Sequence, residues 1–275
     1  MSAPDGYTRA AVAGTGVIGC ELAACATLVG EVRLWARSDV SAWRAEEEAQ
    51  STAAKVEGGS AERIRVTTDV ADLDGCDLVV EAIAEDLEAK VELLASLGEA
   101  CPQADLASTT SSLSIRELGR RSGHAERVFG LHVFNPVSRM ELVELCLPEG
   151  VRAEITELAT DWCRALGKTA VEVPDQPGFV VNRLLFPYLF DAVRLTEQSG
   201  ISAADVDASM RLGAAHPMGP LRLLDLVGLD VAAAIGDSLH AESGEPAHEV
   251  PQTIRRMVSE GKLGRKAGGG FYGYE

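Results

Sequence analysis

The chain has 275 residues, of which 46% are hydrophobic and 24% charged, and its formal net charge at pH 7 is −17. This length allows one large domain or two smaller ones. The negative charge argues against nucleic acids and anionic membranes as partners, because both bind positively charged surfaces.

Neither a leader peptide nor a membrane span is evident in the chain. The segment 1–8 is short and polar, and no apolar run approaches the ~20 residues that a membrane span needs. The cysteines show no C-x-x-C pair and no metal-ligand spacing, so we expect reduced thiols in or near the cores, and no metal. These features predict a cytoplasmic protein. The cysteines are Cys20, Cys25, Cys76, Cys101, Cys146 and Cys163.

The first motif is a glycine-rich turn between a strand and a helix. An apolar strand over 9–13 leads into Gly14-Thr15-Gly16-Val17-Ile18-Gly19, followed by an alanine-rich helix over 20–29 and a second strand over 32–36. In the G-x-G-x-x-G fingerprint the first glycine permits the turn, the second lets the pyrophosphate approach, and the third lets the helix pack on the strand. The phosphates then bind at the helix N-terminus. This context predicts a dinucleotide-binding domain.

The end of the second strand bears on the choice between NAD and NADP. An acidic residue at this position usually binds the ribose hydroxyl, whereas this chain has Arg37 followed by Ser38. Arginine and a hydroxyl can hold a 2′-phosphate, which favours NADP. One alternative stays open, in which Arg37 is an ordinary surface residue and Asp39 binds the ribose of NAD.

The first half continues as alternating strands and helices. We expect strands over 64–67, 77–82, 104–108 and 128–133, and a helix with Leu87, Val91, Leu94 and Leu97 on one face. Ligands bind at the carboxyl ends of strands in such open sheets. Ser111 follows one of these strands and His132 ends another, so both are expected beside the nicotinamide.

Three polar residues lie at fixed distances from His132. Glu144 follows it by 12 residues within the apolar run 140–147, Ser111 precedes it by 21, and Asn182 follows it by 50. A histidine, a carboxylate, a hydroxyl and an amide can remove a proton from an alcohol while its carbon gives up hydride. Each also has a structural interpretation: a histidine at a strand end, an exposed strand glutamate, a helix-capping serine, and an asparagine that begins a helix.

The second half is predicted to be helical. After a strand that ends near 173, the segment 174–178 resembles a hinge. Helices are expected over 179–199 with Pro187 inside, after the capping serine Ser202, and over 221–227, 231–239 and 250–260. The predicted domains are residues 1–174, a dinucleotide-binding Rossmann-like domain, and 175–275, an all-α domain.

Taken together, the motifs resemble the 3-hydroxyacyl-CoA dehydrogenase family, which includes 3-hydroxybutyryl-CoA dehydrogenases. The resemblance covers nearly the whole chain and rests on motifs that occur in a fixed order. These motifs are the segments 14–19, 80–85, 110–115, 130–136, 142–144, 177–183, 216–220, 225–230 and 262–272.

The resemblance implies a role for each candidate residue. His132 is the general base on the 3-hydroxyl and Glu144 fixes its tautomer. Ser111, Asn135 and Asn182 hold the substrate, while the cofactor is NADP or NAD. The residues implied in cofactor binding are Gly14, Gly16, Val17, Ile18, Gly19, Arg37, Ser38, Glu85 and Lys90. The helical domain is expected to complete the acyl pocket and to form a homodimer.

Two departures from the family pattern concern the substrate. Thr109 replaces a common asparagine. The segment 37–64 is shorter than in relatives and acidic at Glu46, Glu47 and Glu48, so it suits the CoA nucleotide poorly. The substrate is therefore a 3-hydroxyacyl-CoA or, alternatively, a carrier-protein-linked hydroxyacyl group or a small hydroxy acid. A non-catalytic dinucleotide-binding sensor or structural protein is the alternative from another class.

Overall fold

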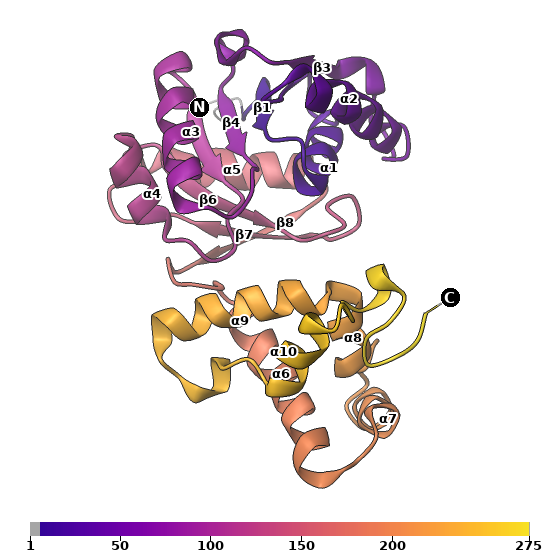
Figure 1. The fold of residues 1–275 in the computed structure, drawn as a ribbon. Helices are drawn as coiled ribbons and strands as arrows, with labels where there is room; N and C mark the ends of the chain where they lie inside the picture. The colour runs from indigo at the N-terminus through magenta and orange to yellow at the C-terminus, as the bar shows by residue number, and fades with distance from the viewer. Residues whose placement is uncertain (1–5, 275) are drawn as a thin grey trace. The chain divides into compact units, whose positions relative to one another are not determined.

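An eight-stranded sheet forms the centre of the first part of the chain in the computed structural model, which describes residues 6–274 (Figure 1). Its strand order is β3-β2-β1-β4-β5-β6-β7-β8. The strands are β1 (Ala10–Ala13), β2 (Val32–Trp35), β3 (Ile64–Thr67), β4 (Leu78–Glu81), β5 (Asp105–Ser108), β6 (Val128–Val133), β7 (Leu142–Cys146) and β8 (Thr169–Val173). Strands β1 to β6 are parallel, β7 is antiparallel to β6, and β8 is parallel to β7. The first six strands have the order of the doubly wound dinucleotide-binding fold, which confirms the predicted Rossmann-type class.

Five helices cover this sheet. They are α1 (Val17–Ala26), α2 (Asp39–Ala53), α3 (Leu87–Ala100), α4 (Ile115–Ser122) and α5 (Glu154–Ala165), with short 3₁₀ turns at Ala61–Arg63 and Val70–Leu73. Helix α1 packs against α2, and α3 packs against α4. Right-handed crossovers explain the pairing, because they place the first two helices on one face of the sheet and the next two on the other. Residues of α1, α2 and α5, among them Leu22, Ala49 and Trp162, share one core with the strands.

Helix α3 presents one apolar face to the sheet, as the sequence predicted. Asp86 begins the helix, and its side chain accepts a hydrogen bond of 2.9 Å from the backbone N–H of Ala89. Leu94 and Leu97 are fully buried. Lys90 lies four residues before Leu94, so the helical repeat places it on the same buried face, and its side chain is also fully buried.

The second part of the chain begins at Pro177, where the two compact units divide, and it is helical as predicted. Its helices are α6 (Val181–Ser199), α7 (Ala203–Gly213), α8 (Pro220–Val227), α9 (Leu229–Ser243) and α10 (Gln252–Ser259), with 3₁₀ turns at Pro246–His248 and Arg265–Ala267. Helix α6 contains Pro187 and packs against α8 and α9. The side chain of Ser202 caps α7 by accepting a hydrogen bond of 3.1 Å from the N–H of Asp205.

Two buried carboxylates tie the C-terminal turn to these helices. Asp225 accepts hydrogen bonds of 2.9 Å from the N–H groups of Phe271 and Tyr272. Asp207 accepts a bond of 2.7 Å from the hydroxyl of Tyr272 and a bond of 2.8 Å from the N–H of Leu221, at the start of α8. These two carboxylates are therefore structural, because each accepts hydrogen bonds from two donors of other segments.

Candidate functional site

The glycine-rich turn follows β1 and opens α1. Gly14 has a φ of +141°, and a Cβ there would lie 2.3 Å from the carbonyl oxygen of Ala82. A Cβ at Gly19 would lie 2.1 Å from the carbonyl oxygen of Gly14, whereas a Cβ at Gly16 would meet nothing within 4 Å. Gly14 and Gly19 are thus required by the fold, while Gly16 leaves open space at the N-terminus of α1, where a pyrophosphate would bind.

A pocket of about 1030 Å³ adjoins this turn. Of the predicted site residues, Gly14, Gly16, Val17, Ile18, Arg37, Glu85 and Ser111 line it. Sequence reasoning missed Trp35, Val70, Leu93 and Ser96, which also line it. Trp35 ends β2, at the edge of the sheet where the glycine-rich turn follows β1, and this place at a strand end could have predicted it. Val70 comes from the turn after β3, and Leu93 and Ser96 come from α3. The position of these two elements beside the pocket is known only from the fold. The open glycine turn and the size of this pocket fit a dinucleotide.

Two residues of the segment that follows β2, Arg37 and Ser41, belong to the wall of this pocket. Arg37 is exposed and lines the pocket together with Ser41. Ser38 caps α2, because its hydroxyl accepts a hydrogen bond from the N–H of Ser41 and lies 3.0 Å from the Ser41 hydroxyl. Asp39, the alternative ribose ligand, is the exposed first residue of α2. Neither Ser38 nor Asp39 is among the residues that line the pocket.

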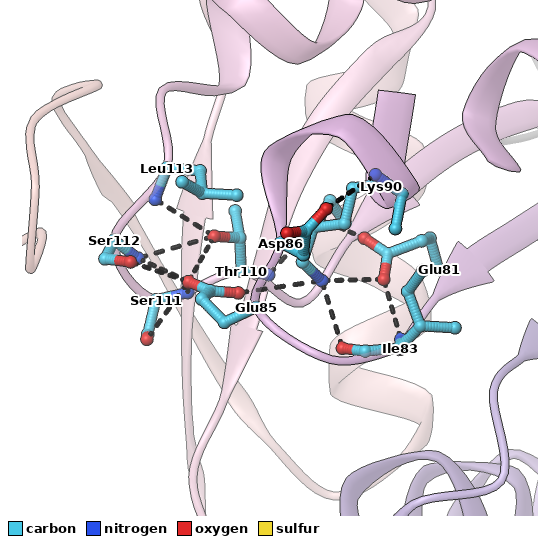
Figure 2. Close-up of polar contacts among 11 residues, drawn as sticks. Glu81, Ile83, Glu85, Asp86, Lys90, Thr110, Ser111, Ser112 and Leu113 are labelled. Carbon is cyan, nitrogen blue, oxygen red and sulfur yellow. Dashed lines mark hydrogen bonds and ion pairs between the residues drawn. The ribbon is translucent and has the colours of Figure 1, made fainter. Parts of the chain in front are cut away.

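The turn after β5 is built around the carboxylate of Glu85 (Figure 2). Its Oε1 accepts hydrogen bonds of 3.0 Å from each of the N–H groups of Ser111 and Ser112, and one of 2.6 Å from the hydroxyl of Thr110. Burial raises the pKa of Glu85, but the nearby Lys90 ammonium and the bonds from Thr110, Ser112 and Ser111 outweigh it and leave the pKa below its usual value. Glu85 is therefore a charged acceptor that shapes the pocket wall.

His132 and Glu144 face each other across the antiparallel pair of β6 and β7. Their Cα atoms are register partners, and His132 Nδ1 lies 2.7 Å from Glu144 Oε2. Both residues are buried, with exposed fractions of 5% and 1%. The ring of His132 also packs on Phe134, with centroids 4.5 Å apart. A buried carboxylate on one ring nitrogen holds the imidazole in one orientation, which is the arrangement of a histidine base.

The substrate residues predicted from the sequence lie in both units. Ser111 lines the pocket and is partly buried. It follows the carboxyl end of β5, and the neighbouring strand β6 contains His132. Asn135 is exposed and follows β6. Asn182 is buried in the first turn of α6, in the second unit. The roles of Ser111, Asn135 and Asn182 in substrate binding stay predictions.

The cysteines form no competing site. All six are buried and free, as the sequence predicted. Burial raises the pKa of Cys101 to about 11, which keeps this thiol protonated and unreactive at neutral pH. Within residues 6–274, no group of three histidine, cysteine or acidic side chains could hold a metal ion, and no helix is long and apolar enough to span a membrane.

Comparison with known proteins identifies relatives along the whole chain. Residues 9–176 match the family model "3-hydroxyacyl-CoA dehydrogenase, NAD binding domain", and residues 178–274 match "3-hydroxyacyl-CoA dehydrogenase, C-terminal domain". The human mitochondrial hydroxyacyl-coenzyme A dehydrogenase is 44% identical over 215 residues, which cover 77% of this chain and 68% of that protein. A 3-hydroxybutyryl-CoA dehydrogenase of Mycobacterium tuberculosis is 44% identical over 214 residues, 76% of this chain and 74% of the relative.

A solved structure agrees with these matches. The crystal structure of M. tuberculosis FadB2 has a TM-score of 0.93 and 36% sequence identity to this chain. The match covers 98% of this chain and 100% of that one.

Proposed function

This chain belongs to the 3-hydroxyacyl-CoA dehydrogenase family, and we propose that it interconverts a 3-hydroxyacyl thioester and its 3-oxoacyl form at the His132–Glu144 pair. It is an oxidoreductase that acts on CH–OH groups with NAD(H) or NADP(H). The observation that carries the residue assignment is the buried contact of 2.7 Å between His132 Nδ1 and Glu144 Oε2, one strand away from the turn that holds Ser111.

The path of the proton follows from this geometry. With its Nδ1–H donated to the Glu144 carboxylate, neutral His132 has its basic lone pair on Nε2. The substrate 3-hydroxyl gives its proton to Nε2, its C3–H bond breaks, and the C3–O bond becomes a carbonyl. An oxidised nicotinamide held in the pocket would supply the acceptor for the hydride that leaves C3. Glu144 then stabilises the imidazolium, and Ser111 donates a hydrogen bond to the substrate oxygen.

For the cofactor we propose a preference for NADP over NAD. Arg37 and Ser41 both line the pocket, so a guanidinium and a hydroxyl are available on this wall. A 2′-phosphate suits a guanidinium, whereas the carboxylate that usually recognises the ribose of NAD is absent from this wall position.

For the substrate we propose that the CoA nucleotide contributes less than the acyl end. Helix α2 presents Glu46, Glu47 and Glu48 to solvent, and this acidic surface would repel a phosphorylated nucleotide. The proposal therefore includes carrier-protein-linked thioesters. Equal catalytic efficiency on a CoA thioester and on its truncated pantetheine analogue is the expected result, and a large loss on truncation would contradict it.

The activity itself is tested with purified protein, both nucleotides and a series of 3-hydroxyacyl thioesters. We expect reduced nicotinamide to appear together with an equal amount of the 3-oxoacyl thioester, identified by mass spectrometry. Nucleotide binding without turnover on any of these thioesters would instead indicate the non-catalytic sensor or structural protein.

A further inference from the structure

The connection between β6 and β7 bears on how the two residues of the candidate base face each other. His132 lies on β6 and Glu144 on β7, and the segment 134–141 joins the two strands. Within this segment the carbonyl oxygen of Pro136 accepts hydrogen bonds of 3.0 Å from the N–H groups of the residues three and four positions further on. The chain therefore turns back sharply, and a shift of this turn would shift the ends of both strands.

Two charged side chains from outside the hairpin hold the turn at Val137. The carboxylate of Glu21, on α1, accepts a hydrogen bond from the backbone N–H of Val137. The ammonium of Lys168, immediately before β8, donates hydrogen bonds to the carbonyl oxygen of Val137 and, at 2.9 Å, to that of Met140. Three segments that are distant in sequence therefore meet at one residue of the turn.

Burial makes these contacts necessary. Val137 has an exposed fraction of 0% and Lys168 one of 9%, so water reaches these groups poorly. A buried backbone N–H without an acceptor destabilises the fold, as does a buried ammonium without oxygen atoms around it. If Glu21 were lost, the N–H of Val137 would regain a partner only by a movement of the turn toward solvent.

The opposite charges of the two side chains support the same arrangement. Burial raises the pKa of the Cys25 thiol in α1, whereas Lys168 lowers this pKa and Glu21 raises it. Both charges thus act on one buried thiol, which places them near each other and lets them attract. Glu21 and Lys168 form a clamp on Val137, in which one binds its N–H and the other its carbonyl oxygen.

Glu21 reaches the hairpin from the helix that follows the glycine-rich turn. It lies within α1, but it is not among the residues that line the pocket. Its contact with Val137 joins α1 to the β6–β7 turn. A change at Glu21 therefore acts on this turn and leaves the pocket wall in place.

We propose that Glu21 is a positioning residue that acts through Val137, fixing the β6–β7 turn and so keeping His132 opposite Glu144. This inference rests on the proposed function, in which His132 is the base and Glu144 its partner. Loss of the clamp is expected to lower kcat by about 10- to 100-fold, because a displacement of about 1 Å in a catalytic group costs up to ~10²-fold in rate.

The first test compares two substitutions of Glu21. Glu21→Met keeps the length of the side chain and removes the acceptor, whereas Glu21→Gln keeps an oxygen that can accept the N–H of Val137. We expect kcat to fall about 10-fold or more in Glu21→Met and to stay within about threefold of wild type in Glu21→Gln, with the nucleotide dissociation constant within about threefold in both. An unchanged kcat in Glu21→Met, an equal loss in both variants, or weaker nucleotide binding in place of a lower kcat would overturn the proposal.

Glu31→Met is the matched control for the loss of one carboxylate. Glu31 is an exposed glutamate that follows the same helix, and it is not among the residues that line the pocket. We expect this control to leave kcat within about twofold of wild type. A loss as large as that of Glu21→Met would overturn the proposal, because it would trace the effect to net charge and not to the clamp.

A second variant keeps the proposal testable if Glu21→Met fails to fold. Glu21→Ala also lacks the acceptor, and alanine is the residue with the highest helix propensity, so α1 is preserved. Its kcat should fall as in Glu21→Met, and thermal melting confirms that the protein is folded. A folded Glu21→Ala variant with the wild-type kcat would contradict the positioning role.

A double-mutant cycle tests the route through the His132–Glu144 pair. Glu144→Gln removes the charged partner of His132 and is combined with Glu21→Met, or with Glu21→Ala in its place. If Glu21 acts by keeping the pair opposed, the double variant should be slower than the slower single variant by less than about threefold. Effects on kcat that multiply would overturn the proposal.

The outcome for Glu144→Gln alone separates this inference from the proposed function. If Glu144→Gln keeps the wild-type kcat, the partner role of Glu144 is wrong and the positioning role of Glu21 is overturned with it. If Glu144→Gln is slow and the two effects multiply, the proposed function stands and only the positioning role is overturned.

Discussion

Arg37 and Arg44 are two exposed arginines close in sequence, so they provide a test variant and its control for the cofactor proposal. Both are exposed, but only Arg37 lines the pocket, while Arg44 lies on α2. We expect Arg37→Asp to lower the ratio of kcat/KM for NADP to that for NAD by about 10-fold or more, because a carboxylate repels a 2′-phosphate and accepts a bond from a ribose hydroxyl. Arg44→Asp makes the same change in charge and should leave the ratio within about twofold. An unchanged ratio in Arg37→Asp would show that Arg37 is not the selector.

Glu85 also makes a prediction about pH and stability. Its pKa is lower in the folded protein than in the unfolded chain, so its ionised form stabilises the fold above the ordinary glutamate pKa of about 4.3. This contribution is lost as the pH falls through the lower pKa of the folded state. Glu85→Gln should therefore reduce the free energy of unfolding at neutral pH, and the difference from wild type should shrink in acid. Urea unfolding measured across this range checks it, and a difference independent of pH would contradict the assignment.

The residues of the site differ in how far the sequence could predict them. His132 and Glu144 were identified by spacing and resemblance, but the spacing of 12 residues does not specify an antiparallel pair with these two in register. Lys90 is expected at the cofactor, and that role stays a prediction; the structure shows its side chain fully buried and 2.7 Å from Glu81. Its partner Glu81 ends one strand and accepts a hydrogen bond from Ser108 on another, and such long-range contacts cannot be deduced from a local pattern.

At the scale of elements, the glycine-rich turn contains one glycine that the fold requires, Gly19, and one that we assign to nucleotide binding, Gly16. A Cβ at Gly19 would collide with the Gly14 carbonyl, whereas one at Gly16 would meet no protein atom within 4 Å. Gly19→Ala should therefore lower the melting temperature and weaken nucleotide binding, since α1 must move away from β1. Gly16→Ala should leave the melting temperature within about 2 °C while raising the nucleotide dissociation constant about 10-fold or more. Thermal melting with a binding titration checks both variants, and normal nucleotide binding by Gly16→Ala would contradict the assignment of the phosphate site.

The strands and helices themselves were largely predictable from local patterns. The strands at 64–67 and 128–133 have the predicted bounds, because the first alternates apolar and polar residues and the second is a mostly apolar run. Helix α1 begins at Val17 and not at residue 20, since the glycine turn already supplies its first helical residues. The antiparallel pairing of β7 with β6, after six parallel strands, could not be predicted from the sequence.

At the scale of the whole molecule, the homodimer stays a prediction that the surface of the second unit allows us to test. Leu184 and Leu195 of α6 and Leu212 of α7 have exposed fractions of 71%, 48% and 84%. Burying such side chains favours association by about 1.5–3 kcal/mol each, so Leu184→Glu and Leu212→Glu should shift a dimer toward monomer. Sedimentation velocity over a range of concentrations measures this. A monomeric wild type, or a dimer unaffected by both changes, would contradict a dimer formed through these helices.

The central claim is that His132 takes the proton of a 3-hydroxyacyl thioester while the nicotinamide takes the hydride. The most direct measurement is the initial rate of nicotinamide reduction by a 3-hydroxyacyl-CoA at saturating nucleotide, in wild-type protein and in His132→Gln. The account predicts turnover by wild type and a loss of about 10²–10⁴-fold in the variant, with the nucleotide dissociation constant unchanged. A variant that keeps the wild-type rate, or a wild type that binds nucleotide and oxidises no 3-hydroxyacyl thioester, would contradict it.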